Sequence, residues 1–245
     1  MKVAAILLLA LLPACRTSEP RWEHVDPDPQ AYQILAGSQR ALGATDWVQT
    51  ISALALVAGP HGSFETRVHS ARDGRARLDL GGQFLAGVGA CHGWLVDDSA
   101  GMVRPLDGVS RSVVRGHELH MLVVAPETRW RKPRSRGTES WAGKPALAVE
   151  FRDDLGKPAL LYLRQSDTLP VGLKLVNHTG HGAADVTVSF SEWKKVSGVR
   201  LFRRAVFEHG GNRYVYDYTQ LKVNAMLDTL FEPPRQLARA SDSHR

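Results

Sequence analysis

Apolar and polar residues alternate with a period of two along most of the chain from Ile51 onward. Such alternation is typical of β-strands with one buried face. Turn signals such as Asp73-Gly74 separate the alternating segments. The pattern predicts a first strand that ends at Gly59, and then strands at 64–70, 76–80, 94–96, 102–106, 135–141, 146–152, 159–164, 171–177, 184–193, 199–208 and 213–219.

Two segments have a helical period instead. The first follows Asp28, which can cap a helix that begins with a proline, and it ends before Gly43. The second covers residues 109–124, where one helical face carries Val113, Val114, His117, Met121 and Leu122. We therefore expect helices over about 30–43 and 109–124.

The later strands each have one apolar face opposed by polar or small residues. A meander of about ten such strands with only two helices must curl around something, either the helices themselves or a ligand that shares the concave face. The sequence thus predicts a mainly β (α+β) fold: a single large, strongly curved antiparallel half-barrel sheet with two helices covering the concave face. The residues predicted to line an apolar cavity there are Leu147, Val149, Leu161, Leu163, Leu173 and Phe190.

The N-terminus has a different composition from the rest of the chain. Residues 4–12 form an apolar run of the length typical of a signal-peptide core, too short for the roughly 20 residues of a membrane-spanning helix. We expect a signal peptide at 1–14, a tether at 15–29 that is rich in prolines and charges, a folded domain at 30–234 and a flexible tail at 235–245.

The end of the apolar run, Leu12-Pro13-Ala14-Cys15, resembles the lipobox of bacterial lipoproteins. The resemblance implies cleavage before Cys15 and attachment of acyl groups such as palmitate to that residue. Arg16 follows the cysteine in place of an aspartate, which implies the outer membrane, facing the periplasm. The alternative is an ordinary signal peptide with a chance cysteine.

The net charge and the number of cysteines restrict the class of protein further. The 245 residues include 31 Lys and Arg against 25 Asp and Glu, for a net charge of +6, and only two cysteines. Apolar content excludes a disordered protein, and the cysteine count excludes a small disulfide scaffold. Most of the excess charge lies in one segment, for which we predict contact with a membrane or lipid headgroup through Arg129, Trp130, Arg131, Lys132, Arg134 and Arg136. A solvated basic loop is the alternative, and export argues against nucleic acid as a partner.

No constellation in the sequence specifies catalysis. Gly89-Ala90-Cys91-His92-Gly93 matches a G-x-C-x-G nucleophile elbow, but a strand follows where the elbow requires a helix. A Cys91-dependent hydrolase is therefore the least favoured function. The pairs His117/His120 and His178/His181 lack a third ligand at a suitable spacing, so we predict no metal site and no cofactor.

One further pattern, a stripe of alternating tyrosines, has a structural and a functional interpretation. Tyr214, Tyr216 and Tyr218 form an aromatic stripe on one strand face. Such a stripe either packs the core or lines a lipid cavity.

Three groups of residues resemble the LolA/LolB-like outer-membrane lipoprotein-sorting superfamily. Residues 34–50 resemble its opening helix, glycine and first strand; Gly93-Trp94, Gly101 and Pro105-Leu106 resemble its G-x-W…G…P-L hairpin; residues 190–199 and 223–234 are similar to the C-termini of related exported proteins. The resemblance implies a non-catalytic half-barrel that holds acyl chains of a lipid or lipoprotein. The alternative on the same fold is a module that binds an envelope protein partner or senses envelope stress.

Overall fold

A computed structural model describes residues 27–90, 92–97, 100–153, 156–179, 182–225 and 228–234. The predicted signal peptide, Cys15, Cys91 and the predicted tail lie outside the described residues. The predicted division of the chain into leader, tether, domain and tail therefore stays a prediction.

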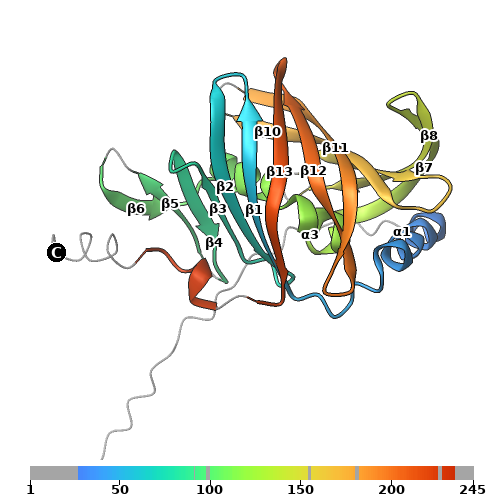
Figure 1. Cartoon of the computed structure of the whole chain (residues 1–245), viewed down its shortest axis with the longest axis horizontal. Coiled ribbons are helices and arrows are strands. Elements are labelled where there is room, and N and C mark those ends of the chain that lie inside the picture. Colours follow the sequence, from blue (N-terminus) through green and yellow to red (C-terminus); the bar gives the residue numbers. More distant parts are fainter. Residues whose placement is uncertain are drawn as a thin grey trace, which may run out of the picture.

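The described chain forms one antiparallel sheet of 13 strands in the order β6-β5-β4-β3-β2-β1-β13-β12-β11-β10-β9-β8-β7 (Figure 1). The sheet is strongly curved and open, which confirms the predicted mainly β half-barrel. Its strands are β1 (Thr50–Gly59), β2 (Gly62–Ala71), β3 (Ala76–Leu80), β4 (Phe84–Val88), β5 (Gly93–Asp97), β6 (Met102–Pro105), β7 (Arg131–Trp141), β8 (Lys144–Arg152), β9 (Pro158–Arg164), β10 (Pro170–Thr179), β11 (Gly182–Val196), β12 (Val199–His209) and β13 (Asn212–Val223).

Strand β4 is absent from the sequence-based prediction. Its residues, Phe-Leu-Ala-Gly-Val, do not alternate between apolar and polar because both faces are covered. The glycine, Gly87, lies directly beneath the indole of Trp94, where an added Cβ would be 2.5 Å from Cε2. Trp94 also donates a hydrogen bond of 2.8 Å from Nε1 to the carbonyl oxygen of Phe231, in the short helix η2 (Asp228–Phe231). Two of the segments that carry the family resemblance thus meet in space.

Helix α1 (Pro29–Leu42) is confirmed with the predicted caps. The Asp28 carboxylate accepts hydrogen bonds from the backbone N–H groups of Gln30 and Ala31, and Gly43 ends the helix with a φ of 100°. The same carboxylate accepts from the N–H of Ser135 in β7 at 2.8 Å. These backbone donors, Ser135 first, hold the pKa of Asp28 below its usual value. The cap therefore also attaches α1 to the edge strand β7.

The prediction of a single helix over 109–124 is wrong in one respect. This segment forms two helices, α2 (Gly108–His117) and α3 (Leu119–Val124). Glu118 lies between them with ψ at 38°, outside the helical range. Its carboxylate is fully buried and binds Arg115 and Arg129. The break between α2 and α3 therefore places Glu118 in a buried ionic cluster with the two arginines. Arg129 directly follows the short helix η1 (Pro126–Thr128).

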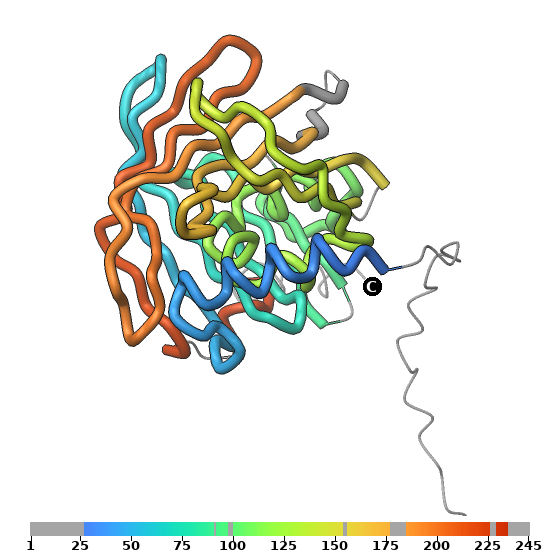
Figure 2. The backbone as a smooth tube through the Cα atoms, turned by 90° about the vertical axis from the view of Figure 1, so that its right-hand side faces the viewer, coloured from blue at the N-terminus to red at the C-terminus, as the bar shows by residue number. Residues whose placement is uncertain are grey.

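Helices α2 and α3 lie inside the curve of the sheet (Figures 1 and 2). All six side chains of α3 are buried, and α2 packs against β3, β4 and β10. Side chains of α2 and α3 therefore fill the part of the concave face that these helices cover. Of the two possibilities that the sequence left open for this face, plugging by helices is therefore observed where α2 and α3 pack.

Candidate functional site

The sheet separates locally between β10 and β11. Pairing of these strands runs from Gly172 and Ser189 to Thr179 and Gly182, and beyond Ser189 strand β11 pairs only with β12. A cavity of about 550 Å³ lies at this separation. We name it the lateral pocket; its main lining residues are Trp141, Lys144, Arg164, Val171, Phe190 and Trp193.

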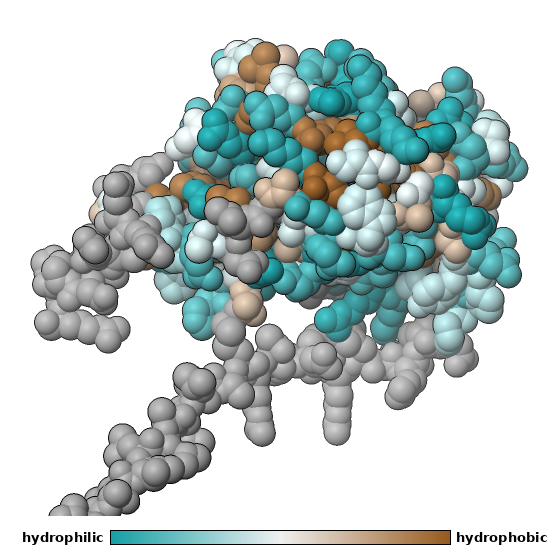
Figure 3. All heavy atoms as spheres, turned by 60° about the horizontal axis from the view of Figure 1, so that its bottom comes forward, coloured by the Kyte–Doolittle hydropathy of each residue, from teal (hydrophilic) through white to brown (hydrophobic). Residues whose placement is uncertain are grey.

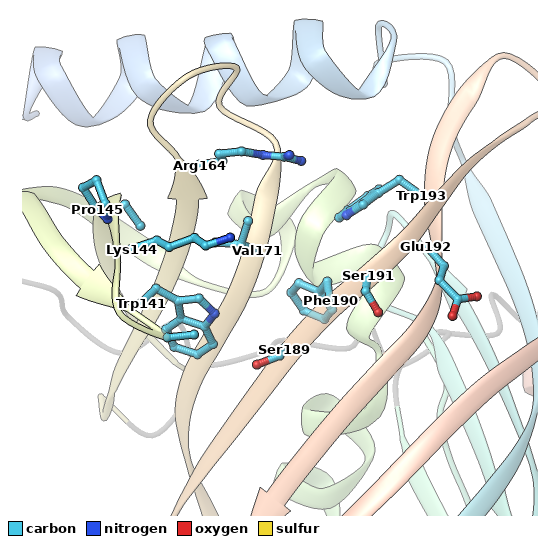
Figure 4. Close-up of a pocket in the computed structure, with 12 residues that line it drawn as sticks. Trp141, Lys144, Pro145, Arg164, Val171, Ser189, Phe190, Ser191, Glu192 and Trp193 are labelled. Carbon is cyan, nitrogen blue, oxygen red and sulfur yellow. The ribbon is translucent and has the colours of Figure 1, made fainter.

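Three aromatic side chains form the apolar part of the lateral pocket. Figure 4 shows Trp141, at the β7–β8 hairpin, across the opening from Phe190 and Trp193 of β11, with α1 passing above. The Phe190 ring stacks on Phe202 at a centroid distance of 4.4 Å, and Trp193 meets Phe202 edge-on at 5.5 Å. Because Phe202 is fully buried, the floor of the pocket is the margin of the core itself.

Charged side chains lie at the rim of the lateral pocket. Lys144 and Arg164 extend from β8 and β9 toward β11 (Figure 4). Arg164 pairs with Asp167 at 3.1 Å, whereas no ion pair of Lys144 occurs among the described residues. Glu192, also at the rim, lies 3.8 Å from Arg204. The arrangement joins an apolar floor to a cationic edge, which suits a ligand with an apolar chain and an anionic end.

Trp141 is held in place by a glycine. An added Cβ at Gly172 would be 1.9 Å from Cζ2 of the Trp141 indole and 2.3 Å from Cε2. The ring therefore lies on bare backbone, beside Tyr162 at 4.5 Å between ring centroids. This contact fixes one wall of the lateral pocket.

We expect Gly172→Ala to displace the Trp141 ring and to lower the free energy of unfolding by about 1–3 kcal/mol, as overpacking does elsewhere. Denaturant unfolding followed by tryptophan fluorescence measures both effects. The control is Gly116→Ala in α2, where the new methyl would meet only Leu175 Cδ1, at 3.6 Å. Equal stabilities of the two variants would show that the ring does not depend on Gly172.

A second large cavity, of about 540 Å³, lies on the concave side between the tips of the hairpins. We name it the rim pocket; it is lined mainly by Phe64, Leu80, Phe84, His117, Phe207, Tyr214 and Tyr216. His117 stacks on Phe207 at 5.6 Å, its Nδ1 lies 2.8 Å from the Val113 carbonyl oxygen, and burial lowers its pKa. Among the described residues, no Lys, Arg, Asp or Glu lines this pocket. It differs from the lateral pocket by lacking a cationic edge.

The six predicted cavity residues lie together, but mostly not at an open cavity. Val149, Leu161, Leu163 and Leu173 are fully buried in the main core cluster, and Leu147 packs against it partly exposed. Of the six, only Phe190 lines either large pocket. The strand faces were therefore predicted correctly, while ligand contact by these residues stays a prediction. The strand pattern does not single out Trp141, Lys144, Arg164 or Trp193. The signal in the sequence that points to them is aromatic residues beside basic ones at strand ends.

The predicted basic segment is not an exposed loop, and this corrects the expectation for two of its residues. Arg129 and Trp130 are both only 5% exposed. Arg129 Nη2 donates to Glu118 and to the Ala71 carbonyl oxygen, at 2.7 and 2.6 Å, and Trp130 packs on Phe151. The rest of the segment, Arg131, Lys132, Arg134 and Arg136, lies in strand β7, which begins four residues earlier than the predicted strand. Of the six predicted residues, membrane contact stays a prediction only for these four.

The remaining candidate residues are those of the tyrosine stripe and the two histidine pairs. Tyr216 and Tyr218 are buried, so the stripe packs the core, and Tyr214 and Tyr216 also line the rim pocket. Contact of the stripe with a lipid stays a prediction. His117 and His120 contact backbone carbonyl oxygens, and the side chains of His178 and His181 lie outside the description. Within the described residues, no group of three potential ligands could hold a metal, and no helix is long and apolar enough to span a membrane.

The fold is similar to solved structures of the LolA superfamily. A LolA superfamily protein from Nitrosomonas europaea is 17% identical over 83% of this chain and 97% of its own, with a TM-score of 0.58. A DUF1329 family protein from Desulfovibrio piger is 15% identical over 85% of this chain and 98% of its own, also with a TM-score of 0.58. No protein-family model and no curated protein matches the chain. The structural likeness establishes a LolA-like fold, as the sequence motifs implied.

Proposed function

We propose that this LolA-like protein binds an acyl chain of a lipid or lipoprotein in the lateral pocket and acts in lipid or lipoprotein transport or sorting in the bacterial envelope. The observation that carries the proposal is the opening of about 550 Å³ between β10 and β11, where the core margin at Phe190 is accessible beside Lys144 and Arg164. An acyl chain would pack on Trp141, Phe190 and Trp193. An anionic end would meet the two cations.

The driving force would be burial of methylene groups, at about 0.8 kcal/mol each. A charge-assisted contact with Lys144 would orient the bound lipid. No bond is made or broken, so the proposal assigns no catalytic residue and needs no cofactor.

The proposed location follows from the N-terminal sequence. Cleavage of the signal peptide would leave Cys15 as the acylated N-terminus, anchored in the outer membrane and facing the periplasm. A tether through residue 29 and the domain that begins near residue 30 would then keep the lateral pocket within reach of envelope lipids.

We expect a photoreactive fatty acid to crosslink to the full-length protein at residues around Phe190 and at the β7–β8 hairpin, as read by mass spectrometry of the peptides. Ser191→Trp places an indole at the lateral pocket, which Ser191 lines from an exposed position. Excluding two methylenes from the pocket costs about 1.6 kcal/mol, so this variant should lose about tenfold in crosslinking.

The matched control is Ser63→Trp, because Ser63 is also an exposed strand serine but lines the rim pocket. It should leave the crosslinks near Phe190 unchanged. Crosslinks near Tyr214 that only Ser63→Trp removes would place the chain in the rim pocket and contradict the proposed site. Absence of crosslinks at both pockets would contradict lipid binding and favour a protein-binding module. The mass of the N-terminal peptide in the same spectra reports whether Cys15 is acylated.

A further inference from the structure

The β11–β12 hairpin ends in a tight, well-supported turn. Val196 pairs with Val199, and the two residues between them, Ser197 and Gly198, have φ values of 48° and 93°, as a type I′ turn requires. Helix α1 and the segment that follows it pack on this turn. An added Cβ at Gly43 would be 2.7 Å from the Gly198 carbonyl oxygen, and Trp47 lies near Gly198. The turn is thus a rigid projection of the fold.

This hairpin carries positive charge that the fold leaves uncompensated. The fifteen residues 193–207 include five basic and no acidic side chains. Lys194, Lys195 and Arg200 are exposed, and no ion pair involves them within the described residues. Lys195 lies directly opposite Arg200 in the strand register. Like charges at directly opposed positions destabilise an antiparallel pair, so stability of the fold does not explain them.

Several basic residues elsewhere on the sheet lie close to acidic ones. Arg204, in the same hairpin but farther from the turn, lies 3.3 Å from Asp217. In the edge strand β7, Arg136 lies 3.7 Å from Glu150 and 3.9 Å from Glu139. Basic groups on an edge strand also protect it from pairing with another sheet. The β7 cations therefore have structural explanations that the hairpin cations lack.

An exposed tryptophan accompanies the free cations. Trp47 is 42% exposed although large aromatic residues are usually well buried, and it lies against the turn. Figure 3, in which the bottom of Figure 1 comes forward, shows a small hydrophobic area surrounded by hydrophilic side chains. Tryptophan favours the boundary between lipid headgroups and acyl chains, and lysine and arginine near it attract anionic lipids.

We propose that Trp47, Lys194, Lys195 and Arg200 form a docking surface for an anionic phospholipid bilayer. We name these four residues the hairpin surface. A stable protein interface involves about 20–30 residues on each side, whereas a bilayer needs only a few cations and an interfacial aromatic group. Three uncompensated cations beside one exposed indole match the bilayer. The docking is independent of the proposed acyl-chain binding.

The test is hydrogen–deuterium exchange of the full-length protein on vesicles of phosphatidylcholine with and without 30% phosphatidylglycerol. Any N-terminal anchor is the same on both vesicles, so it does not affect the comparison. We expect the peptides that cover Trp47 and residues 193–200 to exchange several-fold more slowly only when phosphatidylglycerol is present. Exchange in β7 should be equal on both vesicles.

The variant Lys194→Ser/Lys195→Ser/Arg200→Ser should lose this protection, because three cations contribute on the order of 100-fold to association with an anionic surface. The matched control, Arg134→Ser/Arg136→Ser/Arg152→Ser, removes equal charge from β7 and β8 and should retain it. Equal exchange of the hairpin on both vesicles would overturn the proposal and favour an acidic protein as the partner. Loss of protection in the β7–β8 variant alone would overturn the proposal and would show that the basic edge strand is the docking surface.

Discussion

Replacing Glu118 by glutamine is expected to lower the free energy of unfolding by about 3–5 kcal/mol, since breaking a buried ion pair leaves a charge without its partner in the interior. The Glu118 side chain is fully buried and that of Arg129 is 1% exposed. Arg129 Nη2 and Arg115 Nη1 lie 2.7 and 2.6 Å from the carboxylate oxygens. Denaturant unfolding at neutral pH measures the loss.

The control is Glu127→Gln, because the partly exposed Glu127 lies 3.3 Å from Arg72 at the surface. Exposed pairs contribute about 0–1 kcal/mol, so this variant should remain close to the parent. The double variant Glu118→Leu/Arg129→Met should lose less stability than the sum of its two single changes, because it removes both charges together. A loss equal to the sum, or a small effect of Glu118→Gln, would show that the cluster does not act as a unit.

The same cluster shows why one helix could be predicted and the other only in part. The signals for α1 are local: Asp28 at the cap, a proline in the first turn and Gly43 at the end. The break at Glu118 depends on Arg129, which in turn donates to the Ala71 carbonyl oxygen, 58 residues away in sequence. Periodicity within 109–124 contains no information about either partner. The apolar pattern therefore predicts a continuous helix.

The candidate site also has some features that the sequence predicts and others that it does not. Alternation identified the core face of β8 to β11, which the buried Val149, Leu161 and Leu173 confirm. Whether that face is open or filled depends on the volume that α2 and α3 occupy. The lateral pocket depends on where β10 and β11 stop pairing and on the contact between Trp141 and Gly172. These are non-local properties that a strand pattern does not contain.

Charge gives a third example. The sequence concentrates basic residues in 129–136, and the largest local excess is an obvious candidate for membrane contact. In the fold, Arg129 is buried with Glu118, and Arg136 lies near Glu150. The cations without ion pairs in the β11–β12 hairpin are fewer and less conspicuous in the sequence. What distinguishes them is that they form no ion pair among the described residues and that Lys195 lies directly opposite Arg200 in the strand register.

The second large effect expected is a loss of about 3 kcal/mol of stability between pH 6.5 and pH 4 that depends on His120. The His120 ring stacks on Phe202 at 4.0 Å, and its Nε2 lies 3.0 Å from the Phe202 carbonyl oxygen. Burial lowers its pKa from 6.5 to about 4, and the nearby charge of Arg203 adds to the effect. A difference of about 2.5 pKa units between the unfolded and folded states corresponds to about 3 kcal/mol.

The sign of this pH dependence follows from which state of the protein binds the proton first. As the pH falls below 6.5, the unfolded chain protonates His120 first, so this contribution to stability is complete above that pH and disappears as the pH approaches 4. His120→Phe keeps an aromatic ring on Phe202 and cannot titrate. Denaturant unfolding of both proteins from pH 7 to pH 4 should therefore show a steeper loss for the parent. His117, His69 and the carboxylates titrate in both proteins, so parallel curves would show that His120 is not the group whose protonation opposes folding.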